Sequence, residues 1–468
     1  MPEPSLVEVT ERSGSPLDVS AELAENLEAL IEAGQQAMVL NLIADLYPAD
    51  IERILSHLPM EEAKRLFEWL PADVAGEVLA ELDSTFRARL LREVDPARIT
   101  ALVDELDTDD AADVLADLPE DVAQEVLPDL EDADEIKQLL VYDEETAGGL
   151  MDREYVAALP SWTVEQVTEE VRRHAEDVDI YGVFIVDEAH HLLGIVPLKR
   201  ILLSPPGTRM SEVMETDLIT VPVEADQEEV ARIMERYDLV SLPVVDAEGR
   251  LMGRITIDDV VDVLREEAEE DIQRMSGVTG DEEPTDSVAR IVRGRLPWIL
   301  AGMVGSGVAA FVIGTFTGAL SAVPVLASFI PIVMATAGNA GIQSSAIAVQ
   351  GLASGDVWVS DIARRLVKEL LVGLLNGFLA ALVLGLCIVL VGTFAPEKIA
   401  DAPRLALTAG VSLMIVIVLA TIIGAAIPLL LERLGVDPAI ATGPFITGSN
   451  DILGTLIFFW LATHFYLS

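Results

Sequence analysis

The sequence predicts a multidomain protein in which an α+β soluble part precedes an all-α transmembrane domain of five helices. Three observations lead to this prediction. The first 288 residues hold 21 Lys and Arg against 71 Asp and Glu, a net charge of −50, whereas the remaining 180 hold nine against eight. The acidic part contains a short helical repeat followed by two units with strands. The near-neutral part contains five apolar segments that each reach the ~20 residues needed to cross a bilayer.

The charge distribution excludes several functions. A part of the chain at −50 repels phosphate groups, so we expect no nucleic-acid partner, and it cannot anchor on an anionic membrane surface. The single cysteine, Cys387, lies in an apolar run, which excludes a disulfide framework and a thiolate metal site. The first residues, MPEPSLVEVTERSG, contain no basic segment followed by an apolar one. We therefore expect no cleaved signal and a cytoplasmic acidic part.

A flexible tail at residues 1–21 is predicted to precede an acidic α-helical repeat domain at residues 22–145. Steps typical of helix starts, such as those at Pro48 and Pro59, recur every 11 or 12 residues. Proline at the first helical position, followed by an acidic residue, favours a helix start. Between the starts, apolar residues fall at helical spacing. The pattern predicts an α-solenoid in which each short helix buries one face on its neighbours.

One acidic stretch in this domain, DTDDAAD at residues 107–113, is denser than the others. Asp109 and Asp113 are spaced i, i+4, so their carboxylates share one helix face and repel each other unless they are neutralised. A divalent cation with oxygen ligands would neutralise them. A solvated face that complements the helix dipole is the other interpretation, and spacing alone favours it.

Residues 146–271 change to mixed helix and strand character, with two similar units of about 60 residues. Strands are predicted at Gly182–Val186 and Ser241–Val245, each preceded by a helix, at Val164–His174 and Gln227–Tyr237. The second unit then contains the step Gly253-x-Ile255-Thr256-x-x-Asp259 and resembles a cystathionine-β-synthase (CBS) module.

This resemblance implies a tandem CBS pair whose cleft can bind an adenine nucleotide such as ATP. Thr256 and Asp259 are the candidate nucleotide-binding residues. The first unit reads Pro197-Leu198-Lys199-Arg200 at the equivalent step and lacks both side chains, which weakens a nucleotide site there.

An acidic run closes the CBS region, and a linker helix is predicted after it at residues 272–295. A charged, exposed helix is the simpler interpretation of the run, but acids at this density, with Arg265 the only base among them, are costly without counter-ions. The run consists of Asp258, Asp259, Asp262, Glu266, Glu267, Glu269, Glu270 and Asp271.

The transmembrane domain is predicted at residues 296–468. Pro324, Pro331, Gly338 and Gly341 predict a break in the second span. With a cytoplasmic N-terminus, seven Lys and Arg lie inside and two lie outside, which follows the positive-inside bias and places the C-terminus outside. The spans are predicted near 296–319, 323–352, 367–393, 405–431 and 442–466.

Asp451 lies about ten residues into the fifth span, near mid-membrane at ~1.5 Å per residue. An ionisable residue at this depth indicates function, and no Lys, Arg or His lies within one helical turn of it. A cation site is favoured over a protonated structural Asp. Asn339, in the predicted break, and Thr447 add oxygen donors that suit a hard cation such as Mg²⁺.

The whole layout resembles the MgtE magnesium channels. The local sequence agrees in Arg295-Leu296-Pro297-Trp298, in AGNAGIQSSA at 337–346 and in LGVDPAIATGPFITGSNDILG at 434–454. The resemblance implies a homodimer in the cell membrane with one pore between subunits, which mediates Mg²⁺ uptake. Its pore site would combine Asp451 with oxygens of the same motif, including Gly443. The family motif carries two adjacent threonines where this chain has Thr447-Gly448, which leaves selectivity among Mg²⁺, Mn²⁺ and Ca²⁺ open.

The resemblance also implies that cytosolic Mg²⁺, bound between the helical domain, the CBS pair and the linker helix, closes the pore. Sensor positions of the family fall on acids in all three parts and in the loop before the fifth span. They are Glu77, Asp109, Asp113, Asp226, Asp238, Asp259, Glu270, Asp271 and Asp437, to which we add Asp262 and Glu266 from the acidic run.

Other classes fit less well. An intramembrane metalloprotease needs HExxH, and the apolar half has only His464, so we expect no enzyme. A CBS-regulated osmolyte or anion carrier needs buried Arg or Lys, which we do not expect in the spans. An ion-coupled carrier of Mg²⁺, Mn²⁺ or Co²⁺ is the alternative to a channel.

Overall fold

The computed structural model describes residues 21–92, 94–174, 180–278, 282, 287–354, 362–394, 399, 401–441 and 443–468. The predicted tail therefore lies outside the described residues except for its last position. The chain divides into two compact units, Met1–Leu264 and Arg265–Ser468, and the boundary falls within one continuous helix, α15 (Ile257–Met275).

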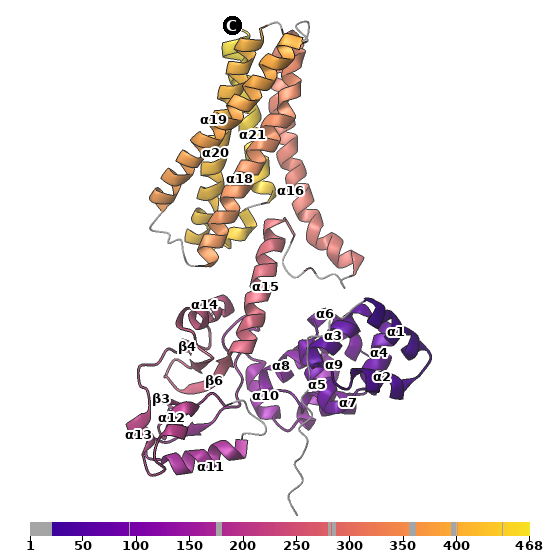
Figure 1. Ribbon diagram of the computed structural model, residues 1–468, viewed down its shortest axis with the longest axis vertical. Helices are drawn as coiled ribbons and strands as arrows, with labels where there is room; N and C mark the ends of the chain where they lie inside the picture. Colours follow the sequence, from indigo (N-terminus) through magenta and orange to yellow (C-terminus); the bar gives the residue numbers. More distant parts are fainter. Residues whose placement is uncertain are drawn as a thin grey trace, which may run out of the picture. The chain divides into compact units, whose positions relative to one another are not determined.

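The N-terminal unit begins with a series of short helices (Figure 1). The helices α3 to α9 each start twelve residues after the previous one, so the predicted helix repeat is confirmed. Asp83 and Asp95 cap two of them by accepting hydrogen bonds from backbone N–H groups of the first turn. The bounds are α1 (Ala21–Glu32), α2 (Gln36–Ile43), α3 (Pro48–His57), α4 (Met60–Trp69), α5 (Ala72–Glu81), α6 (Ser84–Leu91), α7 (Pro96–Val103), α8 (Thr108–Ala116), α9 (Glu120–Val126) and α10 (Ala133–Leu139).

The apolar faces of these helices form a core that continues into the second CBS module. Ile51, Ile54 and Leu55 of α3 are fully buried, and the same cluster extends to Val244 and Ile255. The segment between α10 and the first module joins the two parts, because Asp152 N–H donates to the Arg254 carbonyl at 2.8 Å. The repeat domain and the second module are therefore packed as one body.

The two CBS modules have the same topology. In each three-stranded sheet the first pair of strands is parallel and the second is antiparallel. The helices and strands predicted before each hairpin are confirmed with the same bounds. The elements are β1 (Ala157–Ala158), α11 (Val164–His174), β2 (Gly182–Val186), β3 (Leu192–Pro197), α12 (Leu198–Leu203), α13 (Met210–Val213), β4 (Val221–Pro222), α14 (Gln227–Tyr237), β5 (Ser241–Val245) and β6 (Leu251–Thr256).

The prediction of one linker helix at 272–295 is wrong. The helix α15 starts inside the predicted CBS region and ends at Met275, and the next helix starts at Val288. Helix-forming residues run without interruption from Ile257, and Gly277 then stops the helix. Its φ of +77° is the left-handed conformation that glycine adopts at little cost, and its N–H bonds back to the Arg274 carbonyl at 3.0 Å.

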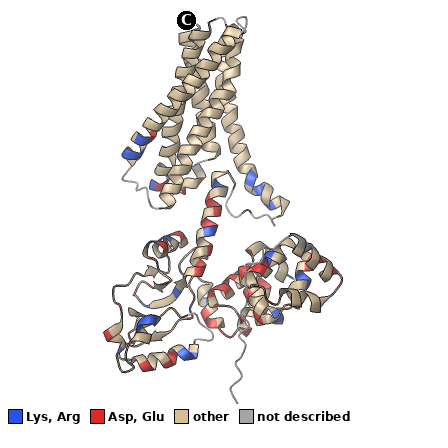
Figure 2. Cartoon of the chain, in the orientation of Figure 1, with Lys and Arg blue, Asp and Glu red and all other residues tan. Residues whose placement is uncertain are grey.

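Among its described residues, the second unit contains five helical segments long and apolar enough to cross a membrane. Acidic side chains gather on the N-terminal helices and along α15, whereas the membrane helices carry few charges (Figure 2). The segments are α16 (Val288–Thr315), the 3-10 helix η2 (Pro324–Phe329) with α18 (Ile330–Ala353), α19 (Ile362–Phe394), α20 (Ala402–Arg433), and α21 (Pro444–Leu461), which is extended by a π turn to Tyr466; α17 (Thr317–Ala322) follows α16, and the 3-10 helix η4 (Pro438–Ala441) precedes α21.

The predicted break at Gly338 and Gly341 is also wrong. The helix α18 runs through both glycines without interruption, and the irregular stretch is the 3-10 helix η2 before it. The glycines permit close packing instead. A Cβ on Gly341 would overlap the side chains of Asn450 and Ile446, and one on Gly424 would overlap the Gly341 backbone.

Candidate pore and cation-sensing sites

Asp451 lies in the first half of α21 and is 8% exposed. Thr447 precedes it by one turn on the same helix face and is half-buried. Within the described chain, no Lys, Arg or His forms an ion pair with Asp451. A carboxylate in this position is costly to ionise unless a cation accompanies it.

Two other polar residues of the Asp451 motif donate hydrogen bonds, one to the neighbouring helix α18 and one within α21. Asn450 donates from Nδ2 to the Ala337 carbonyl of α18 at 3.3 Å, and Ser449 donates to the Phe445 carbonyl at 2.7 Å. No side-chain hydrogen bond is found for Thr447 among the described residues, and it lies beside Gly338 of α18. Asp451 and Thr447 are thus two oxygen donors of this motif that are available to an ion.

Asn339 and Gly443 stay predicted members of the pore site. Asn339 lies on α18 and lines a cavity formed with α19 and α20. Gly443 precedes α21 and lies against the end of α15, where a Cβ would be 3.4 Å from the Met275 carbonyl oxygen and from the Gly277 nitrogen.

An acidic cluster forms where α8, the segment after α10 and the start of α15 meet. Asp109 and Asp110 of α8 and Asp259 of α15 are half-buried and lie within each other's electrostatic field. Asp152 adds a buried carboxylate that accepts from Thr108 at 3.2 Å and pairs with Arg254 at 3.0 Å.

Burial and mutual repulsion raise the pKa values of this cluster. Burial, followed by Asp259 and Asp110, raises the pKa of Asp109 well above its ordinary value. Burial and Asp113 raise the pKa of Asp110 to about 7, and burial and Asp258 raise that of Asp259 to about 7. The cluster therefore holds either protons or a cation near neutral pH.

The predicted pairing of Asp109 with Asp113 is only partly realised. Asp113 is exposed and raises the pKa of its neighbour Asp110, whereas Asp109 is turned toward Asp259 and Asp152. Sequence spacing could not show that Asp110, rather than Asp113, raises the pKa of Asp109. Which of the two acids lies near Asp109 in the buried cluster depends on which side of α8 is buried.

The remaining predicted sensor acids of the N-terminal unit are scattered. Glu77 of α5 and Asp262 of α15 are exposed. Asp226 caps the start of α14 by accepting from Glu228 N–H at 2.9 Å, and Asp238 ends the same helix with φ of 52°. The two carboxylates lie at opposite ends of a helix of about 16 Å, so they do not share an ion.

A second acidic group surrounds the end of α15. Arg274 pairs with both Glu270 and Asp437. Burial raises the pKa of Asp271, and the Asp437 and Glu267 carboxylates raise it further. Asp437 also accepts from Ala439 N–H at 2.7 Å, just before α21. Glu266 is exposed on the same helix.

Thr256 and Asp259 bond to each other across the start of α15. Thr256 donates through its hydroxyl to Asp259 at 2.9 Å and through its N–H at 3.1 Å, which is the geometry of a helix cap. Their equivalents in the first module are Pro197 and Arg200, and Arg200 pairs with Glu215 at 3.1 Å. The Thr and Asp side chains of the predicted nucleotide site therefore occur at this step in the second module and not at the equivalent step of the first.

No three Asp, Glu, His or Cys side chains converge closely enough to hold a metal in the part of the chain that the structure describes. The acidic groups are pairs and loose clusters. A cation bound there would draw carboxylates together or keep part of its water shell.

Sequence comparison identifies the family. Residues 330–461 match the MgtE divalent cation transporter domain, residues 46–145 match the MgtE intracellular N domain, and 147–206 and 210–266 match CBS domains. The magnesium transporter MgtE of Thermus thermophilus is 36% identical over 452 residues, which cover 94% of this chain and 98% of the relative. The chain belongs to the MgtE family.

Two further likenesses accompany this match. The magnesium transporter MgtE of Bacillus subtilis is 30% identical over 95% of this chain and 97% of its own length. The crystal structure of the cytosolic domain of the Mg²⁺ channel MgtE in complex with ATP covers 51% of this chain and 99% of that structure, at 36% identity and a TM-score of 0.49. As an MgtE member with five spans, this chain is a multi-pass membrane protein with cytoplasmic N and CBS domains.

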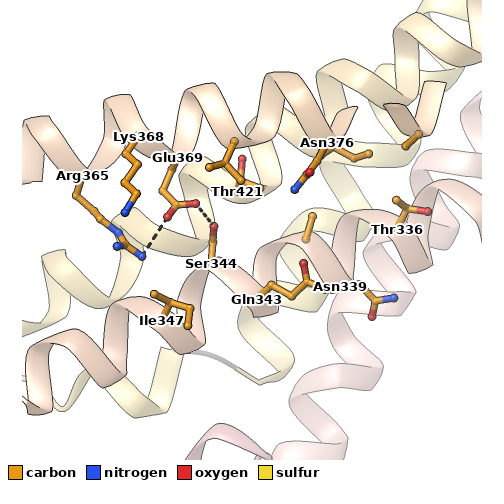
Figure 3. Close-up of a pocket in the computed structure, with 14 residues that line it drawn as sticks. Thr336, Asn339, Gln343, Ser344, Ile347, Arg365, Lys368, Glu369, Asn376 and Thr421 are labelled. Carbon is orange, nitrogen blue, oxygen red and sulfur yellow. Dashed lines mark hydrogen bonds and ion pairs between the residues drawn. The ribbon is translucent and has the colours of Figure 1, made fainter. Parts of the chain in front are cut away.

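One feature of the MgtE transporter domain was missed from the sequence. A cavity of about 610 Å³ lies between α18, α19 and α20 (Figure 3). Glu369, 7% exposed, accepts from Ser344 and pairs with Arg365 at 3.1 Å, and Lys368 lies beside them. Arg365 precedes the predicted third span, 367–393, and Lys368, inside that span, is exposed. The i, i+4 spacing of Arg365 and Glu369 was the signal that could have indicated this pair.

Proposed function

We propose that the chain mediates Mg²⁺ uptake across the cell membrane as a channel and that cytosolic Mg²⁺ closes it. The magnesium transporters that are similar over nearly their whole length support the choice of ion. The observation that carries the proposal is Asp451, a buried carboxylate in a membrane helix without a charged neighbour among the described residues.

The donors around Asp451 suit a hard, partly hydrated cation. Mg²⁺ prefers six oxygen ligands and retains several waters, so one carboxylate and the Thr447 hydroxyl leave most of its shell to water. A second chain related by two-fold symmetry would supply a second carboxylate on the axis. This chemistry supports a homodimer with one pore between subunits, embedded in the bilayer with the C-terminus outside.

The acidic clusters supply the closing signal. Without a cation, Asp109, Asp110 and Asp259 repel one another at neutral pH, and a divalent ion removes that repulsion. Cytosolic Mg²⁺ then favours the conformation in which these carboxylates lie together, by its difference in affinity for the two states.

The continuous helix α15 carries residues of one acidic group at its start and residues of the other at its end. Asp259 lies in its first turn, and its last turn carries Arg274, which pairs with Asp437. The turn after it lies against Gly443 and Pro444, where α21 begins. Cation binding that fixes α15 therefore acts on the helix that carries Asp451.

An adenine nucleotide at Thr256 and Asp259 belongs to the same proposal. Because Asp259 is also part of the acidic cluster, a polyphosphate would enter a field of like charge, and we expect it to bind with Mg²⁺ rather than alone.

Uptake by the Asp451→Ala variant tests the proposal. In Mg²⁺-starved cells that lack their own transporters, we expect uptake to fall by roughly tenfold or more, because the variant removes the carboxylate that would bind the ion in α21. Glu432→Ala, at an exposed acid of the same unit, is the matched control and should keep normal uptake. Normal uptake by Asp451→Ala at equal membrane abundance would contradict the proposed path.

A further inference from the structure

The cavity between α18, α19 and α20 has a charged end and a polar interior. Glu369, Arg365 and Ser344 lie together at one end, and Asn339, Asn376 and Thr336 lie toward the other (Figure 3). Polar side chains recur at helical spacing along both α18 and α19, so each helix presents one polar stripe to the cavity. A space lined in this way is suited to a polar ligand rather than to a hydrocarbon chain alone.

The charged end has surplus positive charge. Glu369 is the single acid in the lining and is already bonded to Ser344 and Arg365. The Nε atom of Arg365 is buried and has no hydrogen-bond partner in the described chain. No ion pair is found for Lys368 among the described residues. Among the described residues, the Nε–H group of Arg365 and the Lys368 ammonium group are thus without a partner at this end of the cavity.

The position of this end in the membrane restricts the ligand. Because the N-terminal domains are cytoplasmic, alternating spans put the connection between α18 and α19 on the cytoplasmic side, and Arg365 and Lys368 lie in the first turns of α19. Basic pockets between helices on that side are typical binding places for the headgroups of anionic lipids. A cation is disfavoured there, since two bases oppose one paired acid.

We propose that this cavity binds the phosphate group of an anionic ligand, held by Arg365 Nε and Lys368 Nζ. A phospholipid headgroup and free phosphate share this chemistry. Gln343, the residue before Ser344 and also part of the lining, can bond the hydroxyl substituents of a headgroup such as glycerol. The ligand would connect α18 with α19 and so stabilise α18, which also packs on α21.

Thermal unfolding of the full chain in detergent tests the site, with three additions: phosphatidylglycerol, phosphatidylcholine and inorganic phosphate. We expect phosphatidylglycerol to raise the melting temperature and phosphatidylcholine to leave it unchanged. A rise with inorganic phosphate equal to that with phosphatidylglycerol would assign the site to free phosphate, and a rise with the lipid alone would assign it to a headgroup; both support the phosphate site.

Variants of the lining complete the test. Lys368→Gln removes a group without an ion pair, and R365Q/E369Q replaces the buried pair by neutral side chains of similar size, so both are designed to fold. Each should lose at least half of the rise, whereas Arg364→Gln, on the adjacent exposed position of α19, should retain it. Equal rises in all variants, or an equal rise with phosphatidylcholine, would overturn the proposal.

Discussion

The cluster at the start of α15 and the single carboxylate on α21 differ in what surrounds each acid. Burial, together with neighbouring carboxylates, raises the pKa values of Asp110 and Asp259 to about 7, so protons can replace a cation there. Asp451 is buried among apolar helices and has no second acid or base beside it in the described chain. The first arrangement suits reversible sensing by several weak contacts, and the second makes one residue indispensable.

The largest expected effect is a separation of the two functions. In D109N/D110N/D259N, the rise in melting temperature caused by Mg²⁺ should fall by more than half, because the repulsion that the ion relieves is gone. The Asp451→Asn variant should keep this rise and lose uptake. Loss of both properties in either variant would show that the two acidic regions do not act separately.

A smaller effect is expected from pH. Asp110 and Asp259 have pKa values of about 7 in the folded chain against 3.8 ordinarily, so they bind more protons folded than unfolded between these values. The free energy of unfolding without Mg²⁺ should therefore fall as pH rises, by roughly 1 kcal/mol per group between pH 6 and 8.

The stabilisation by Mg²⁺ should change in the opposite direction. The ion needs ionised carboxylates, so it should stabilise the chain more at the higher pH than at the lower one. Thermal melts at both pH values, with and without Mg²⁺, measure this difference. An equal effect of Mg²⁺ at both would contradict the raised pKa values in the cluster.

The smallest effect is expected at the ends of α14. Asp226 and Asp238 lie too far apart to share an ion, so D226N and D238N should each change the Mg²⁺ concentration that halves the current by less than about twofold. Patch recordings on the two variants measure this. A loss of Mg²⁺ sensitivity as large as that of D109N/D110N/D259N would show that Asp226 and Asp238 belong to the sensor.

The sequence was sufficient where local rules decide the structure. Proline and aspartate start the repeat helices at the expected positions, and Asp451 stands out by its depth in an apolar segment. Where packing decides, sequence was insufficient: α18 continues through Gly338 and Gly341 because these glycines let neighbouring helices approach closely.

The composition of the sites depends on helix rotation in the same way. Asn339 and Asp451 are both polar residues of membrane helices, but Asn339 faces a cavity with α19 and α20. Asp110, and not the predicted Asp113, is the α8 acid that raises the pKa of Asp109, because of the side of α8 that is buried. The linker helix was predicted to start at residue 272, where composition suggested a domain boundary. The helix-forming residues of α15 cross that boundary, so the helix starts at Ile257 and ends at Met275.

The most direct test of the central claim is the block of current by cytosolic Mg²⁺ in excised patches. The account predicts that D109N/D110N/D259N opens at Mg²⁺ concentrations that close the wild type, with the half-blocking concentration raised at least about tenfold and the conductance through the Asp451 path unchanged. A half-blocking concentration equal to that of the wild type would contradict the claim that this cluster senses the transported ion.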